Sequence, residues 1–230
     1  MGNRIRILAT GDVRGRISPY NDTTGLSEYK GFARLGTLIN ALRDEDTIVI
    51  DNGNALQGSA LMYHHYLKTP ESESPVTAVM EQIGYDYINL GNHDFDYGED
   101  ALMRHLDNLD APCITCNVQS KGKPVFASYA IREIGGKKVA IFGITTHYLK
   151  HLHSNKELRP FRLKDAFLSA KTTAETIRRL EKPDYVIGLY HGGFERDLVT
   201  GMATRELTGE DQAYQITREI AGIDVLITGH

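Results

Sequence analysis

Five apolar segments of the chain each end in a glycine next to a polar residue, and this repeated ending limits the folds that the chain can adopt. The five endings are Gly11-Asp12, Gly53-Asn54, Gly91-Asn92-His93, His191-Gly192 and Gly229-His230. The segments before them contain continuous apolar runs such as IVI, YVIGLY and VLIT, which indicate strands buried on both faces. Apolar residues at helical spacing lie between these strands. Strands that alternate with helices predict an α/β domain.

One pair of strands is predicted to be antiparallel. The segments Ala130–Ile134 and Lys138–Phe142 are joined by Gly135-Gly136, a dipeptide typical of tight hairpin turns. We therefore expect mixed sheets. No long or disordered linker interrupts the chain, so we predict a single domain over residues 1–230.

Charge and hydropathy exclude several kinds of partner. The chain has 26 basic and 30 acidic residues and a net charge of −4, so it lacks the surplus of positive charge that binds a nucleic-acid polymer. No apolar run approaches the length of a membrane span, and the start, MGNRIRILATGD, enters a strand pattern with no signal peptide. We therefore expect no membrane partner. The expected location is cytoplasmic for the chain as written, or extracytoplasmic if a leader has been removed.

The five strand endings predict a polar site. Binding sites of open α/β sheets form outside the carboxyl ends of the strands, and glycine there lets the backbone approach a bound ion or phosphate. A single Asp or His after a strand is usually a turn former, a helix cap or a structural residue. Five endings that together carry Asp, Asn and His favour one shared site. Oxygen and imidazole donors without thiolates suit Mn, Fe, Co or Zn.

The motifs at these endings are similar to those of a known family. In chain order they read GDVRG, DNGNALQGSAL, GNHD, YHGG and ITGH. Over essentially its whole length the chain resembles the calcineurin-like metallophosphoesterases, within the branch of 5′-nucleotidases and 2′,3′-cyclic-nucleotide 2′-phosphodiesterases. The resemblance implies a four-layer α/β/β/α sandwich with two mixed sheets between helices. It also implies a two-metal centre at the strand ends and a nucleotide or another phosphate ester as the substrate.

The resemblance assigns roles to individual residues. The metal ligands that it implies are Asp12, Asn54, Asn92, His191 and His230. His93 would not bind metal but would donate to the phosphoryl oxygen or the leaving group, oriented by Asp94. The two ions would activate a hydroxide for in-line attack on phosphorus and neutralise the charge that develops there.

Three departures from the family pattern concern the metals. Arg14 stands where the family has a histidine ligand, and a guanidinium has no lone pair to offer a metal. Asn54 stands where the family has a bridging aspartate, and its amide brings no negative charge. The chain ends at His230, before the last histidine of the Gly-His-x-His pattern. We therefore expect one divalent ion or none, and a poor or inactive phosphoesterase.

Arg14 has two interpretations. Beside Asp12 it would place a cation near the first metal position, and together with Asn92 and His93 it would bind a phosphate group. Alternatively, Arg14 points from its loop into solvent.

Three hypotheses about function remain open. The first is a metal-dependent phosphoester hydrolase domain with an impaired two-metal centre. The second is a non-catalytic phosphate- or nucleotide-binding or assembly module that kept the fold, and the third is a fragment with no independent role. In the family, further strands and a nucleotide-binding domain follow the last histidine. Their absence from these 230 residues predicts an incomplete second sheet with an exposed edge, and with it a homodimer.

Overall fold

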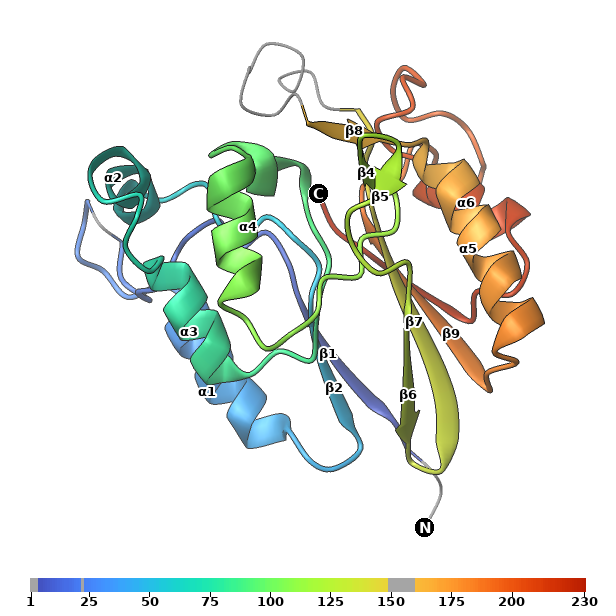
Figure 1. Ribbon diagram of the computed structural model, residues 1–230, viewed down its shortest axis with the longest axis horizontal. Helices are drawn as coiled ribbons and strands as arrows, with labels where there is room; N and C mark the ends of the chain where they lie inside the picture. The colour runs from blue at the N-terminus through green and yellow to red at the C-terminus, as the bar shows by residue number, and fades with distance from the viewer. Residues whose placement is uncertain (1–3, 22, 149–159) are drawn as a thin grey trace.

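Two main β-sheets pack face to face between layers of helices (Figure 1). The computed structural model describes residues 4–21, 23–148 and 160–230. The strands in these ranges are β1 (Arg6–Thr10), β2 (Thr47–Asp51), β3 (Tyr87–Ile88), β4 (Val118–Ser120), β5 (Lys123–Pro124), β6 (Ala130–Ile134), β7 (Lys137–Thr145), β8 (Phe161–Leu163), β9 (Tyr185–His191) and β10 (Val225–Thr228). The helices are α1 (Phe32–Leu42), α2 (Ala60–Lys68), α3 (Pro75–Ile83), the 3₁₀ helix η1 (Asn92–Phe95), α4 (Glu99–Asp107), α5 (Ala166–Leu180) and α6 (Ala213–Glu219). A small third sheet of antiparallel strands, with the order β5-β4-β8, lies at one end of the two main sheets.

The first sheet has the strand order β1-β2-β3, and its pairs are parallel. β2 is buried along its whole length, as its apolar sequence predicts. Helices α1, α3 and α4 lie over the outer face of this sheet (Figure 1). Their apolar side chains form one core cluster with the sheet, which includes Phe32, Met80 and Leu102.

The second sheet has the strand order β10-β9-β7-β6. β10, β9 and β7 are parallel, and β6 pairs antiparallel with β7. The turn between β6 and β7 is formed by Gly135 and Gly136, whose φ angles of 57° and 69° are the left-handed values that a two-residue hairpin turn requires. The predicted hairpin is confirmed, and so is the mixed character of the sheet.

Helices α5 and α6 cover the outer face of the second sheet (Figure 1). Between the sheets lies a third apolar cluster, to which Ile48 of β2, Ile141 of β7 and Leu189 of β9 contribute. The four-layer α/β/β/α sandwich predicted from the sequence is therefore confirmed. None of the described helices is long and apolar enough to cross a membrane.

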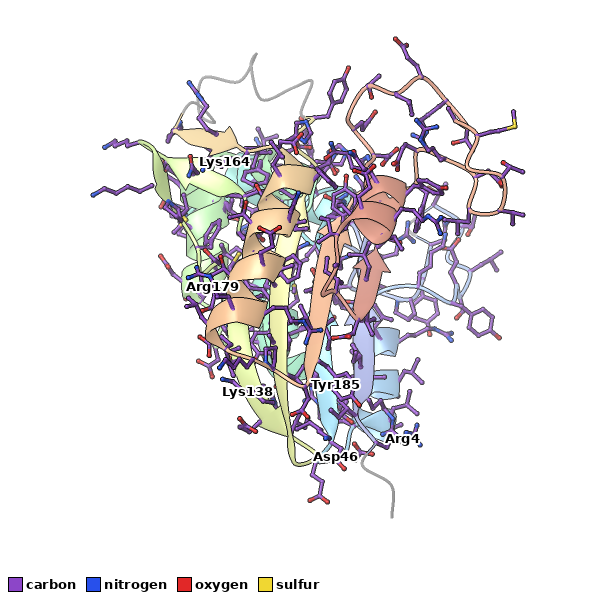
Figure 2. All side chains as sticks on the ribbon, turned by 90° about the vertical axis from the view of Figure 1, so that its right-hand side faces the viewer. Arg4, Asp46, Lys138, Lys164, Arg179 and Tyr185 are labelled. Atoms are coloured by element: carbon purple, nitrogen blue, oxygen red, sulfur yellow. The ribbon has the colours of Figure 1, made fainter. Side chains whose placement is uncertain are left out.

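The parallel strands of both sheets start at the same end of the molecule. Arg4, Asp46, Lys138 and Tyr185 lie at or next to the starts of β1, β2, β7 and β9. Figure 2 shows these four residues together at the lower end of the molecule, with Lys164 at the upper end. The carboxyl ends of these strands therefore all lie at the opposite, upper end.

A short segment between the sheets, residues 113–116, bonds to both of them. The Ile114 N–H donates to the carbonyl oxygen of Ile88 in β3 at 2.9 Å, and the Ile114 carbonyl oxygen accepts from the N–H of Gly143 in β7 at 2.9 Å. The sequence predicts a strand here. The structure instead gives this segment isolated bridges to each sheet, so that it forms a seam between them.

The side chain of Asn89 also links the two sheets. Its Nδ2 donates to Asn52 Oδ1 at 2.9 Å and to the carbonyl oxygen of Ile144 in β7 at 3.0 Å. Its Oδ1 accepts from Thr115 Oγ1 at 2.9 Å. A Cβ at Gly143 would lie 2.4 Å from Asn89 Oδ1, so only glycine leaves room for this side chain. Asn89 is fully buried, and a buried polar network is stabilising when every member has its partners.

We expect Asn89→Ala to lower the free energy of unfolding by about 2–4 kcal/mol, because it leaves several buried polar groups without a hydrogen bond. Urea unfolding followed by circular dichroism measures this change. The matched control is Asn108→Ala, because Asn108 is exposed and its Nδ2 makes only a local bond, to the carbonyl oxygen of Arg104 at the end of α4. The control should lose less than about 1 kcal/mol. Equal losses in the two variants would contradict the proposed role of the inter-sheet network.

Candidate functional site

The polar residues that follow the strands meet at the upper end of the two sheets. Asp12 follows β1, Asn54 follows β2, Asn92 and His93 open η1 after β3, His191 ends β9 and His230 follows β10. Hydrogen bonds and ring contacts connect all six residues, as described below. The structure therefore brings these six residues together at one end of the sheets.

Asn54 lies at the centre of this strand-end site. Its Nδ2 donates to Asp12 Oδ1 at 2.8 Å and to Asn92 Oδ1 at 3.2 Å. Its Oδ1 accepts from the backbone N–H of His93 at 2.8 Å. That backbone donor requires an oxygen opposite it, and this fixes the orientation of the amide. The NH₂ group of Asn54 therefore points between the oxygens of Asp12 and Asn92.

Asp12 uses both of its oxygens in hydrogen bonds. Oδ1 accepts from Asn54 Nδ2 and from Arg14 Nε, at 2.8 and 3.1 Å, and Oδ2 accepts from the backbone N–H of His230 at 3.0 Å. Burial alone would raise the pKa of Asp12. The hydrogen bonds from Asn54 and His230 and the nearby His191 and Arg14 outweigh burial, so that the pKa lies below its ordinary value. Asp12 is therefore a stable carboxylate at neutral pH.

His191 presents an unused nitrogen to the site. Its side chain is fully buried, and Nδ1 lies 2.6 Å from the carbonyl oxygen of Asn52. Burial lowers the pKa of His191, so the ring is neutral: Nδ1–H donates to Asn52 and Nε2 carries a lone pair. Nε2 is buried and has no hydrogen-bond partner among the described residues. The ring of His230 lies beside the ring of His191, and the two ring centroids are 5.5 Å apart.

His93 pairs with Asp96 rather than with Asp94. His93 Nδ1 lies 2.7 Å from Asp96 Oδ2, and both side chains are partly exposed. The expectation that Asp94 orients His93 is therefore wrong. The motif GNHDFD contains both acids, and a partner three residues away on a helical turn lies on the same face as His93, which was the signal available in the sequence.

Asp94 instead supports the backbone of two loops. Its Oδ2 accepts from the N–H groups of Asn54 and Gly91 at 2.7 and 2.9 Å, and its Oδ1 accepts from those of Ala55 and Leu56 at 2.9 and 3.1 Å. Asp94 is buried, and four backbone donors satisfy its charge. Its role in this structure is to position the loops that carry Asn54 and His93.

Arg14 forms an ion pair instead of pointing away into solvent. Its Nε lies 3.1 Å from Asp12 Oδ1, and its side chain is 37% exposed. The backbone of Arg14 is left-handed, with φ 57°, and its N–H donates to the Asn54 carbonyl oxygen at 2.9 Å. Of the two sequence interpretations, the structure agrees with the one that places the guanidinium beside Asp12.

These residues do not fit the two-metal centre that the family pattern implies. Within residues 4–21, 23–148 and 160–230, no three His, Cys, Asp or Glu side chains are grouped so as to hold a metal ion. The NH₂ group of Asn54 faces the oxygens that would bind the cation, and Arg14 adds a positive charge next to them. His191 Nε2 fits a metal ligand, but catalytic metal sites use about three protein ligands.

Asp51 is a buried carboxyl next to the site, at the end of β2. Its Oδ1 accepts from Thr10 Oγ1 at 2.7 Å, and its Oδ2 accepts from the Gly53 N–H at 3.1 Å. Burial raises the pKa of Asp51 to about 8, and the negative charges of Asp94 and Asp12 act in the same direction.

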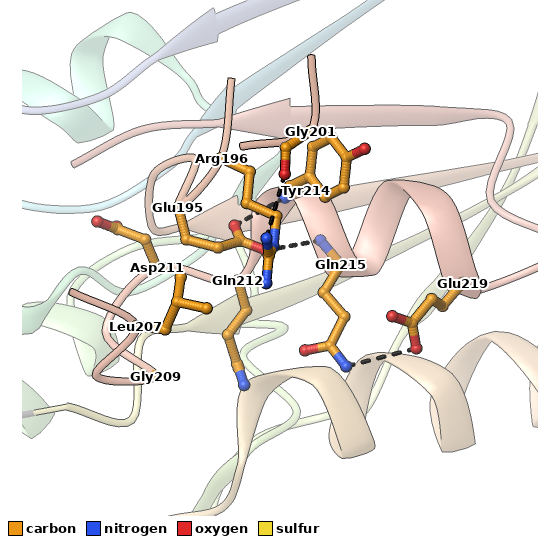
Figure 3. A pocket seen from close by; sticks show the side chains of 10 residues that line it. All are labelled: Glu195, Arg196, Gly201, Leu207, Gly209, Asp211, Gln212, Tyr214, Gln215 and Glu219. Carbon is orange, nitrogen blue, oxygen red and sulfur yellow. Dashed lines mark hydrogen bonds between the residues drawn. The ribbon is translucent and has the colours of Figure 1, made fainter. Parts of the chain in front are cut away.

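A separate pocket of about 480 Å³ lies between α6 and the loop that precedes it (Figure 3). Its buried acid, Glu195, accepts from the backbone N–H groups of Tyr214 and Gln215 at 3.0 and 2.9 Å. A second acid, Asp211, pairs with Arg205 at 2.8 Å. These carboxylates support the local backbone, and the pocket shares no lining residue with the strand-end site.

Comparisons with known proteins agree with the fold. A family model described as "Bacterial capsule synthesis protein PGA_cap" matches residues 6–230. A 5′-nucleotidase of Vibrio parahaemolyticus is 32% identical over 198 residues, which make up 83% of this chain and 33% of that protein. The chain thus spans about a third of the length of this curated relative.

Solved structures show the same similarity. A putative 5′-nucleotidase from Staphylococcus aureus superposes with a TM-score of 0.91 and 27% identity, over 98% of this chain and 45% of that one. The calcineurin-like phosphoesterase YfkN from Bacillus subtilis gives a TM-score of 0.82 and 26% identity, over 98% and 71% of the two chains.

The sandwich fold and these similarities together define a domain of the calcineurin-like phosphoesterase class. The chain belongs to the family that the PGA_cap model describes. The calcineurin-like metallophosphoesterases to which it is similar include 5′-nucleotidases and YfkN. Members of this class use divalent metal ions.

We expect Asp94→Asn to lower the free energy of unfolding by about 2–4 kcal/mol. The new NH₂ group would face backbone N–H donors, and a buried donor without an acceptor is costly. Asp96→Asn is the matched control, because Asp96 is partly exposed and bonds to His93 alone among the contacts described above. The control should lose less than about 1 kcal/mol. Thermal and urea unfolding measure both, and an Asp96→Asn loss as large as that of Asp94→Asn would contradict the assigned roles.

We expect the free energy of unfolding to fall as the pH rises from about 5 to about 8. Asp51 keeps its proton in the folded protein up to a pKa of about 8, whereas the unfolded chain releases it near pH 4. Between these values the folded state binds more protons, so lower pH favours it. Asp51→Asn should reduce the fall by a few kcal/mol. Urea unfolding of both proteins across this pH range measures the effect, and identical pH profiles would contradict the raised pKa.

Proposed function

We propose that this domain binds phosphate esters at the strand-end site and hydrolyses them poorly. In this proposal it is a metal-dependent phosphoesterase domain of the 5′-nucleotidase and cyclic-nucleotide phosphodiesterase type with an impaired two-metal centre. The orientation of the Asn54 amide carries the proposal. Its NH₂ group donates to Asp12 Oδ1 and Asn92 Oδ1, where an aspartate would offer an oxygen to a shared cation.

The charge of the site supports the same proposal. An amide in place of a carboxylate removes one negative charge, and Arg14 adds a positive charge 3.1 Å from Asp12. Divalent cations such as Mn²⁺ are bound largely by carboxylate charge, so both residues weaken metal binding. A phosphate group, by contrast, gains from a nearby guanidinium, which can donate two parallel hydrogen bonds to it.

Nucleotides are the proposed class of phosphate ester. The relatives carry names such as 5′-nucleotidase and "Trifunctional nucleotide phosphoesterase protein YfkN". In our proposal Arg14, Asn92 and His93 contact the phosphate group. His93, paired with Asp96, supplies the proton donor beside the phosphate.

We expect the double variant Arg14→His/Asn54→Asp to gain Mn²⁺ affinity and phosphodiesterase activity, each by about tenfold or more, because it restores a neutral donor and a bridging carboxylate. Metal content is measured by mass spectrometry after dialysis against Mn²⁺. Activity is measured with bis-p-nitrophenyl phosphate. The matched control is Arg179→His/Asn108→Asp, which makes the same chemical changes at two exposed positions outside the strand-end site.

The outcome separates the proposal from its alternative. A gain in the first double variant and none in the control supports an impaired phosphoesterase. No gain in metal or activity contradicts the proposal.

The second candidate function is a non-catalytic phosphate-binding module. The observation that favours it concerns Asp12. Both of its oxygens already accept hydrogen bonds, from Asn54, Arg14 and His230. Under this alternative the natural chain shows no turnover even with saturating Mn²⁺, while it still binds phosphate. Measurable turnover of the natural chain with Mn²⁺ selects the first candidate.

A further inference from the structure

A groove of about 840 Å³ leads away from the strand-end site. Gly11, Asp12 and Arg14 line it where it adjoins the site, and the lining continues along α1 as far as Ala41. From Gly31 to Ala41 a helix rises about 15 Å. The groove is therefore larger than a phosphate group needs and has the size of a small-ligand pocket. We call it the basic groove.

The basic groove carries positive charge on a chain that is negative overall. Four of its lining residues are cationic, namely Arg14, Arg16, Lys30 and Arg34, whereas Asp12 is the acidic one. Glu28 lies next to the groove and pairs with Arg16 at 3.0 Å and with Lys30 at 3.5 Å. Four cations against Asp12 and Glu28 leave a local charge of about +2, which complements the charge of about −1.5 to −2 on a phosphate monoester.

An exposed aromatic ring stands in the same groove. Tyr29 lines it and is 96% exposed. The guanidinium carbon of Arg34 lies 4.9 Å from the centre of the Tyr29 ring, in the range of a cation–π contact. Arg34 is in turn held by Ser27, whose Oγ accepts from it at 2.6 Å. Tyr29 and Arg34 thus form a planar, partly apolar surface that a second ring can stack on.

Part of the lining of the groove is apolar. Val13, Leu35, Leu38 and Ala41 line it, and Leu38 is largely exposed although it is a large hydrophobic residue. Apolar side chains, an exposed aromatic ring and several cations along one groove suit a ligand that has a flat, weakly polar part and an anionic part.

We propose that the basic groove is a recognition subsite for the planar group of an aromatic phosphate ester, with Tyr29 and Arg34 as the stacking platform and Arg14 at the phosphate end. The inference rests on the proposed binding of phosphate esters. It adds residues that select among these esters, so that nucleotides are preferred to aliphatic phosphates. Tyr29, Lys30 and Arg34 act on affinity and specificity rather than on bond cleavage.

Calorimetric titration of the natural chain with AMP, glycerol 3-phosphate and inorganic phosphate tests the inference. AMP should bind at least about tenfold more tightly than glycerol 3-phosphate, which is the effect of one stacked base. Tyr29→Ala should abolish this difference and leave the affinity for inorganic phosphate unchanged. Tyr29→Phe should keep the difference, because the ring remains. Arg34→Gln should weaken AMP binding more than glycerol phosphate binding.

The control variant is Tyr63→Ala. Tyr63 is also an exposed tyrosine, but it lies on α2 and does not line the basic groove, so AMP affinity should not change. Thermal unfolding should show unchanged stability for Tyr29→Ala, since the side chain is almost fully exposed.

Equal affinities of the natural chain for AMP and glycerol 3-phosphate would overturn the inference. An unchanged AMP affinity in Tyr29→Ala would also overturn it. The inference fails as well if the natural chain does not bind AMP and the groove instead binds an acidic peptide. These results leave the proposed function to its own test, because the double variant at Arg14 and Asn54 reports metal binding and hydrolysis, whereas this titration reports relative affinities.

Discussion

One buried carboxylate positions most of the strand-end site. Asp94 accepts from the backbone N–H groups of Asn54, Ala55, Leu56 and Gly91, and so joins the loop after β2 to the loop after β3. These bonds hold the two loops together. Asn54 has a left-handed backbone there, with φ 61°, and its Oδ1 accepts a hydrogen bond from the N–H of His93. The hydrogen-bonded geometry of the site follows from this arrangement, because these backbone hydrogen bonds set the positions of Asn54 and His93 relative to each other.

That geometry makes the identity of residue 54 decisive for the chemistry. The His93 N–H requires an oxygen, so an amide at this position must turn its NH₂ toward Asp12 and Asn92. An aspartate would meet the same backbone donor with one oxygen and turn a second, charged oxygen in the other direction. The hydrogen bond from the His93 N–H is thus compatible with either residue, whereas an aspartate would place one more negative charge between Asp12 and Asn92.

Much of this structure could be predicted from the sequence, and the parts that could not share a physical reason. The apolar strands, the Gly135-Gly136 hairpin, the four-layer architecture and the convergence of the strand endings follow from local patterns and recognisable motifs. The family motif GNHD predicts Asp94 as the partner of His93, whereas the three-residue spacing indicates Asp96, which is the partner in the structure. That four backbone N–H groups occupy Asp94 depends on the tertiary structure and could not be predicted. The raised pKa of Asp51 and the Asn52–Asn89–Thr115 network depend on burial between two sheets. The basic groove joins residues 11–16 to residues 29–41, which no single motif contains.

The seam at residues 113–116 has a consequence for how the molecule opens. Ile114 bonds at once to β3 and to β7, so neither sheet can slide or peel away from the other without breaking bonds that belong to both. We therefore expect the amide protons of Ile114 and Gly143, whose bonds hold the seam, to exchange in a common opening event. A single residue, Ile114, thus joins β3 to β7 through its N–H and its carbonyl oxygen, which belong to two consecutive peptide units.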